Sequence, residues 1–153
     1  MPKVAVQGLR AFFAVVIAYA VVHGLVDLAL LHTVERRSGV TLRGGWRPAG
    51  WIPGHLRIQN VFLEWHDRLR VESGDLEIRS EEPASLLFGK SKIVLSGRKL
   101  TVELGKKYAQ AASSRRIHVD RVEAVVELAV SGEPVIHSLE LESPEIQFHL
   151  KER

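Results

Sequence analysis

The chain has 153 residues, enough for one domain and a short appendage. It is 46% hydrophobic and 25% charged, which argues against wholesale disorder. No cysteine is present, which excludes disulfides, zinc–thiolate sites, thiol catalysis and lipidation on cysteine. The formal net charge of +3 is too small to argue for nucleic acid as a partner.

An apolar run of 21 residues near the N-terminus extends from Ala11 to Leu31. At about 1.5 Å per residue, a helix of this length spans roughly 30 Å, the thickness of a bilayer core. The motif Ala18-Tyr19-Ala20 would also suit signal-peptide cleavage, but the run continues eleven residues beyond Ala20. We therefore expect residues 1–32 to form an N-terminal tail and one uncleaved transmembrane helix.

His23 and Asp27 are the ionisable residues in this run, and their spacing of four places them on one face of a helix. Ionisable groups inside a bilayer usually face protein or water. One interpretation is that His23, Gly24 and Asp27 contact another membrane helix, so that integral-membrane subunits would bind through residues 11–31. The other is that Asp27, one turn from the end of the run, extends toward the interface.

Residues 33–54 are rich in glycine, proline and tryptophan, which predicts a juxtamembrane linker without a long helix or central strand. Arg43, Trp46, Arg47 and Trp51 are of the types found at the headgroup layer, so they are membrane-interface candidates. Alternatively, the two tryptophans cover the open end of the domain core. Basic residues flank the apolar run on both sides, so the orientation prediction depends on the short N-terminal tail: residues 33 onward are expected outside the cytoplasm.

From residue 55 to 153 apolar and polar residues alternate, which predicts strands with one buried face. Apolar positions recur with spacings of two, five and two, in units that start 22 to 24 residues apart. Such a period suggests a repeated pair of strand segments. The step of five would turn side chains to the other face of a straight strand, so we expect a bulge or tight turn inside each unit, at 72–75, 96–99 and 142–145. The units begin at Leu69, Ile93 and Leu139, with a weaker copy at Ile117.

The phrases LRIQNVFLEW, LRVESGDLEIR, KIVLSGRKLTVEL and IHSLELESPEIQFHL, following a membrane helix, resemble AsmA-type proteins of the bacterial envelope. The resemblance covers roughly residues 10–150, as an anchor and a first β module. It implies a mainly β fold, a curved antiparallel sheet, anchored in the bacterial inner membrane with the domain in the periplasm. It also implies an apolar trough that contacts membrane lipids. The trough candidates are Leu69, Val71, Leu76, Ile78, Ile93, Leu95, Leu100, Val102, Leu139, Leu141, Ile146 and Phe148.

No motif of catalysis or metal binding is recognisable. None of the seven histidines has a known ligand spacing, and no serine lies in a nucleophile-elbow context. We therefore expect a non-enzymatic protein without cofactors. Three functions remain open. The first is an AsmA-like protein whose trough contacts lipid, and the second is a structural accessory subunit docked on a larger integral-membrane complex. The third, ranked last, is an enzyme of unrecognised type.

Overall fold

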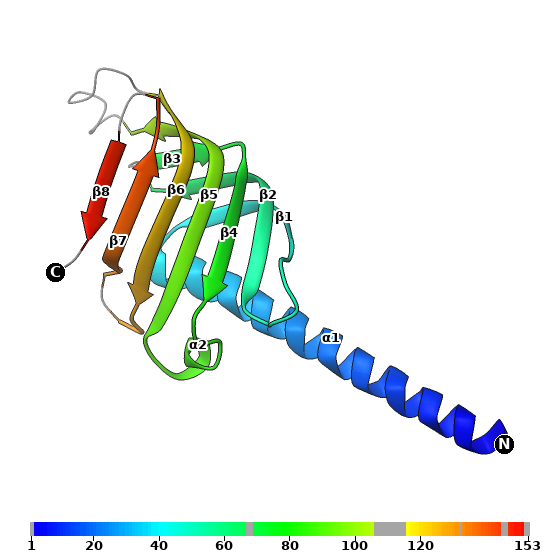
Figure 1. The fold of residues 1–153 in the computed structure, drawn as a ribbon. Helices are drawn as coiled ribbons and strands as arrows, with labels where there is room; N and C mark the ends of the chain where they lie inside the picture. The colour runs from blue at the N-terminus through cyan, green and yellow to red at the C-terminus, as the bar shows by residue number, and fades with distance from the viewer. Residues whose placement is uncertain (1, 67–68, 106–115, 132, 145–146, 152–153) are drawn as a thin grey trace.

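The computed structural model describes the chain except residues 1, 67–68, 106–115, 132, 145–146 and 152–153. One long helix, α1 (Pro2–Ser38), precedes an antiparallel sheet, and the short helix α2 (Ser85–Phe88) interrupts the strands (Figure 1). This confirms the predicted fold class of an N-terminal apolar helix followed by a mainly β domain. The strands are β1 (Thr41–Pro48), β2 (His55–Trp65), β3 (Leu69–Glu72), β4 (Asp75–Ser80), β5 (Ser91–Leu104), β6 (Arg116–Leu128), β7 (Val135–Glu142) and β8 (Gln147–Lys151).

The sheet follows the chain order almost without interruption: β1-β2-β3-β5-β6-β7-β8, with β4 paired to β2 and β5. Every recorded pair is antiparallel. β3 and β4 keep one register against β2 and one against β5, so they are two halves of a single bent strand. The local connectivity explains how alternating sequence segments give a single sheet.

Three neighbouring strands bend at the same level of the sheet. Asn60, Gly74 and Lys99 stand opposite one another in register and all have positive φ, at 51°, 80° and 54°. Residues in this conformation rotate the strand, so the step of five in the apolar pattern returns to the same face. The bends predicted at 72–75 and 96–99 therefore exist, whereas the third expected position falls in the β7–β8 connection. A common origin of the units as repeats stays a prediction.

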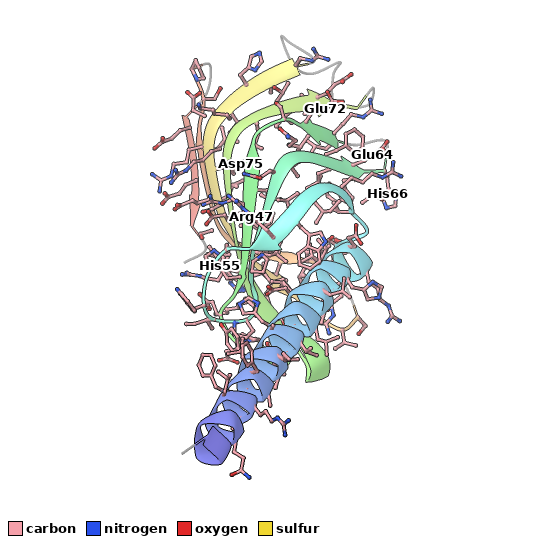
Figure 2. The ribbon with its side chains drawn as sticks, turned by 90° about the vertical axis from the view of Figure 1, so that its right-hand side faces the viewer. Arg47, His55, Glu64, His66, Glu72 and Asp75 are labelled. Carbon is pink, nitrogen blue, oxygen red and sulfur yellow. The ribbon has the colours of Figure 1, made fainter. Side chains whose placement is uncertain are left out.

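The bend folds the first strands over the concave face of the sheet. In Figure 2, β1, β2 and β3 curl above the C-terminal part of α1, and β5 to β7 form the opposite wall. The core lies between these walls, and α1 contributes Leu30 and Val34 to it. Full burial of a leucine contributes about 1.5–3 kcal/mol, so the helix end is part of the domain and not only its tether.

The prediction of a linker at residues 33–54 is wrong for most of these residues. α1 continues to Ser38 and ends at Gly39, whose φ of 68° is typical of a helix-terminating glycine. Residues 41–48 then form β1, which pairs with β2 although it contains Gly44, Gly45 and Pro48. An exposed strand with one neighbour tolerates such residues, because part of its backbone needs no partner in the sheet. Only residues 49–54 form a loop.

Replacing Gly74 by alanine tests the bend. A Cβ at this position would lie 2.2 Å from the Arg98 carbonyl oxygen, and the φ of 80° is strained for alanine. We expect Gly74→Ala to lower the free energy of unfolding by at least about 2 kcal/mol, measured by tryptophan fluorescence of the full chain in detergent. Gly45→Ala is the control, since its Cβ would meet nothing within 4 Å. Equal effects of both substitutions would contradict a role of the bend.

Candidate functional site at the junction of helix and sheet

The N-terminal part of α1 is apolar and exposed. Residues Gln7–Ser38 form a helix that is long and apolar enough to cross a membrane, by length and composition. Exposed apolar side chains run from Leu9 to Leu28, a stretch of about 30 Å at about 1.5 Å per residue. Figure 1 shows this part projecting beyond the sheet. They are Leu9, Phe12, Phe13, Val15, Val16, Ile17, Tyr19, Val21, Val22, Leu25 and Leu28.

The C-terminal part of α1 buries one face against the domain. His23, Asp27, Leu30 and Val34 are buried with spacings of four, three and four, the pattern of a single helix face. Leu30 and Val34 enter the core, whereas the two polar residues face the loop at 49–54. The N-terminal part of α1 therefore has an exposed apolar surface, whereas its C-terminal part buries one face against the domain.

Three side chains of α1 bind this loop, and we call the contact the helix–loop latch. The Asp27 Oδ1 accepts a hydrogen bond of 2.8 Å from the Gly54 N–H. The His23 Nε2 donates to the Gly50 carbonyl at 3.0 Å, and its Nδ1 lies 2.8 Å from the Asp27 Oδ2. The Tyr19 hydroxyl donates to the Trp51 carbonyl. The Nδ1–Oδ2 pair is a close buried contact without hydrogen-bond geometry, so the latch consists of three hydrogen bonds and this polar contact.

Gly54 connects the latch to the sheet. Its carbonyl accepts from the Ser80 N–H at 2.8 Å, while its own N–H binds Asp27. Its φ is 87°, and a Cβ would lie 3.0 Å from the Pro83 Cγ. Glycine is required here because the backbone is left-handed and closely packed on both sides.

Arg37 holds the far end of the helix. Its guanidinium donates to the carbonyls of Gly89 at 2.8 Å, Leu128 at 3.3 Å and Leu86 at 3.4 Å. These oxygens belong to α2, to the residue after it and to the last residue of β6. The planar fork of donors suits several carbonyls at once, which a lysine could not bind equally well. Together with the helix–loop latch, this contact fixes α1 to the domain at two places.

The predicted membrane-helix contacts have partners inside the chain. His23 and Asp27 are 5% and 0% exposed, so neither side chain offers a surface to a second helix. Gly24 is partly exposed, and nothing lies within 4 Å of a Cβ built on it. Binding of another membrane subunit through residues 11–31 stays a prediction.

The predicted membrane-interface residues are divided between two places. Trp51 is 88% exposed in the loop beside Tyr19 and His23. Arg43, Trp46 and Arg47 are exposed on β1, with Arg43 about 13 Å along the strand from Arg47. Trp51 is therefore adjacent to the apolar part of α1, whereas Arg43 lies toward the opposite end of the strand.

The predicted trough residues form the core. Leu30 of the helix packs in one cluster with them, so this part of the concave face is filled by the chain itself. Five candidates are buried, namely Val71, Leu76, Ile78, Ile93 and Leu100, and five are partly exposed, namely Leu69, Leu95, Val102, Leu139 and Leu141. Ile146 lies outside the described residues, as does the side chain of Phe148.

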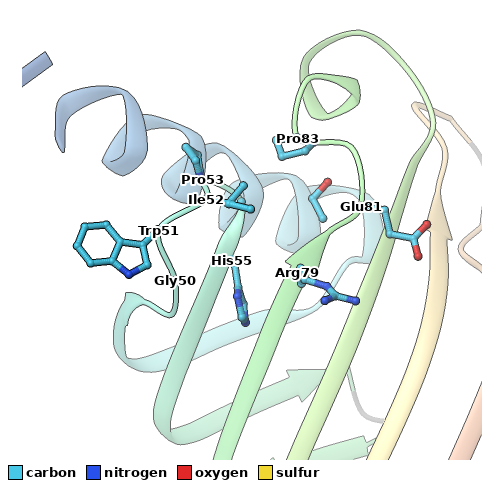
Figure 3. Close-up of a pocket in the computed structure, with 10 residues that line it drawn as sticks. Gly50, Trp51, Ile52, Pro53, His55, Arg79, Glu81 and Pro83 are labelled. Atoms are coloured by element: carbon cyan, nitrogen blue, oxygen red, sulfur yellow. The ribbon is translucent and has the colours of Figure 1, made fainter. Parts of the chain in front are cut away.

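A hollow of about 550 Å³ lies between the 49–54 loop and the end of β4 (Figure 3). Trp51 and Ile52 form its loop side, and Arg79 and Glu81 form its sheet side. Beside it, Glu77 binds both Arg57 and His55. The Arg57 guanidinium, aided by His55, holds the pKa of Glu77 below its usual range against the opposing effect of partial burial.

The residues that the sequence interpretation missed share one property: they act through backbone oxygens or backbone N–H groups. Tyr19, Arg37 and Gly54 belong to no motif, and their partners lie 27 to 91 residues away for the contacts recorded. Only the spacing of His23 and Asp27 indicated that this face of the helix needed a polar partner. Among the described residues, no group of three or more histidines and carboxylates is placed to hold a metal ion.

Removing the carboxylate of Asp27 tests the helix–loop latch. We expect Asp27→Leu to destabilise the chain by roughly 3 kcal/mol, because it leaves the Gly54 N–H and His23 without their buried partner. Hydrogen exchange of the full chain in detergent should show faster exchange at residues 49–54. Asp27→Asn keeps an acceptor oxygen and should protect Gly54 better than leucine does. Unchanged protection in Asp27→Leu would contradict the latch.

The Glu77 cluster predicts a pH dependence. Because the pKa of Glu77 is lowered in the folded state, its contribution is present above the unfolded-state pKa and is lost as pH falls through the folded-state value. We expect Glu77→Gln to cost less than about 1 kcal/mol at pH 7, and we expect this cost to vanish once the pH has fallen below the folded-state pKa of Glu77. Thermal unfolding between pH 3 and 7 measures this, with the exposed Glu140→Gln as the control. A constant difference over this range would contradict the pKa shift.

Comparisons with known proteins leave the family of this chain open. No family model, no curated protein and no solved structure matches it. The resemblance to AsmA-type proteins therefore stays a prediction from sequence phrases. The structure shows an apolar helix that is joined at two places to the antiparallel β domain that follows it.

Proposed function

We propose that this chain is a non-enzymatic, single-pass membrane protein that holds a β domain in a fixed orientation on the bilayer surface. The observation that carries the proposal is the continuity of α1, which runs from an exposed apolar stretch into the domain core. A flexible tether would leave the domain free to rotate. Two polar contacts and two core residues on one helix oppose such rotation.

The apolar exterior supports a membrane as the partner of α1. The stretch from Leu9 to Leu28 matches the thickness of a bilayer core, and His23 and Asp27 within it are buried against the domain. Burial of Asp27 and His23 under the loop removes the main cost of placing this helix in lipid. As in AsmA-type proteins, the proposed location is the bacterial inner membrane, with the domain in the periplasm.

Lipid contact by the concave face is part of the proposal, but over a smaller area than the sequence predicts. The inner side of β6 and β7 retains partly exposed apolar residues: Val122 lies opposite Leu141, and Leu139 lies opposite the buried Ala124. Ile136, which pairs with Val126, is 47% exposed. This side of the sheet is where an acyl chain would find an apolar surface.

A second candidate function is that of an accessory subunit on a larger membrane complex. Val130, Val135 and Ile136 are exposed around the connection between β6 and β7. Apolar side chains that gather at a hairpin end are typical of a protein contact. The proposed partner would be an integral-membrane protein whose extracytoplasmic part reaches this end of the sheet.

The lack of cysteine makes the membrane proposal directly testable. In intact cells we expect a membrane-impermeant maleimide to label Ser131→Cys, which is exposed in the β6–β7 connection, but not Gln7→Cys at the other side of the span. Both variants should remain in the membrane after alkaline washing. Release into the supernatant, or the reverse labelling pattern, would overturn the anchor or its orientation.

Mild detergent extraction followed by gel filtration separates the two functions. A small particle that carries phospholipid would support lipid contact. Stoichiometric co-elution of another membrane protein, lost on Val130→Asp, would support the accessory subunit instead. The matched control is Arg98→Asp, an exposed position on the outer side of β5.

A further inference from the structure

The helix–loop latch places the 49–54 loop beside the membrane span. Tyr19, His23 and Asp27 hold the loop, while exposed apolar residues on the other side of α1 continue to Leu28. A bilayer that covers the helix as far as Leu28 must therefore reach the level of the loop. Gly54, bound by Asp27, lies near the level of Leu28, whereas the Trp51 carbonyl is bound by Tyr19, nine residues earlier on the helix and about 13 Å deeper. Trp51 and Ile52, which are 88% and 74% exposed at the loop tip, are then located among the acyl chains.

The hollow behind the loop therefore extends from the acyl-chain region at Trp51 to the headgroup level at Gly54 and Ser80. It is lined on one side by Trp51, Ile52 and Pro53, and on the other by Arg79, Ser80 and Glu81. Figure 3 shows Arg79 and Glu81 on the sheet side, across from the loop that carries Trp51. The apolar side of the hollow suits the acyl chains of a phospholipid, and the two charged residues on the other side suit its headgroup.

In the part of the chain that the structure describes, the charges of the hollow have no ion-pair partner. Glu77, the nearest carboxylate along β4 from Arg79, is already bound by Arg57 and His55. Among the described residues, neither Arg79 nor Glu81 forms an ion pair, and the buried Ser80 hydroxyl has no hydrogen-bond partner. A cation and an anion two residues apart, each unpaired, form a zwitterionic site.

We infer that this hollow binds the headgroup of an aminophospholipid from the leaflet that faces the domain. The Arg79 guanidinium binds the lipid phosphate through charge-assisted hydrogen bonds, and the Glu81 carboxylate accepts from the lipid ammonium. Ile52 and Trp51 contact the acyl chains. This inference rests on the proposed membrane anchor, and it names the lipid that the anchored domain selects.

Native mass spectrometry of the full chain, released from nanodiscs with equal phosphatidylethanolamine and phosphatidylglycerol, tests the site. We expect the wild type to retain one phospholipid, mainly phosphatidylethanolamine. Arg79→Gln should reduce retention of both lipids about tenfold, the effect of one lost charge-assisted contact. Glu81→Gln should reduce retention of phosphatidylethanolamine alone and reverse the preference. Inorganic phosphate at millimolar concentration should displace neither lipid.

Arg98→Gln is the matched control, because Arg98 is exposed on β5, opposite Asp75 and away from the hollow. The proposal is overturned if Arg79→Gln and Arg98→Gln behave alike, if Glu81→Gln leaves the preference unchanged, or if phosphate displaces the lipid. Alkaline washing of the same variants reports on the anchor separately. A chain that stays in the membrane but retains no lipid refutes the headgroup site alone, whereas a chain that is washed off refutes the anchor as well.

Discussion

The carboxylate of Asp27 sets the main constraint on this structure. A carboxylic acid in an apolar helix is costly unless its oxygens find polar partners, and here one oxygen accepts from the Gly54 N–H while the other lies 2.8 Å from the His23 Nδ1. To bring Gly54 to that position, β1 must run back along the helix and the chain must turn tightly before β2. The carbonyl of Gly54, a residue in the left-handed conformation, then accepts a hydrogen bond from the Ser80 N–H of β4. The position of three strands relative to α1 follows from a single side chain.

The sequence predicted the elements better than their contacts. Alternation of apolar residues revealed strands, and the step of five in that alternation indicated bends that the structure places at Ser73, Gly74 and Lys99. Both signals are local, because they depend on which face a side chain takes within one strand. The loop that binds His23 and Asp27 could not be predicted in this way. Its partners are backbone groups of Gly50 and Gly54, which carry no side-chain signal of the pairing.

Amino-acid composition gave a wrong prediction where pairing with a neighbouring strand outweighs the low strand propensity of glycine and proline. Residues 41–48 have the glycines and proline of a linker, yet β2 supplies a complete neighbour for them and they form β1. The trough was misjudged for a related reason. Alternation shows that one face of the sheet is apolar, but not what covers it. Here the covering residues are Leu30, which was assigned to the transmembrane helix, and Val34, which was assigned to the linker. A free concave face and a covered one have the same sequence pattern.

The two attachments of α1, at His23–Asp27 and at Arg37, make helix and sheet one mechanical body. A helix in a bilayer responds to its thickness by tilting, and thinning of the lipid increases the tilt. If α1 spans a bilayer as proposed, its two attachments to the domain would turn such a tilt into a rotation of the whole sheet. In such a rotation, the end of the sheet farthest from the 49–54 loop would move most, because displacement increases with distance from the membrane. An anchored domain of this construction would convert the local thickness of the bilayer into the height and angle at which its outer strands are presented.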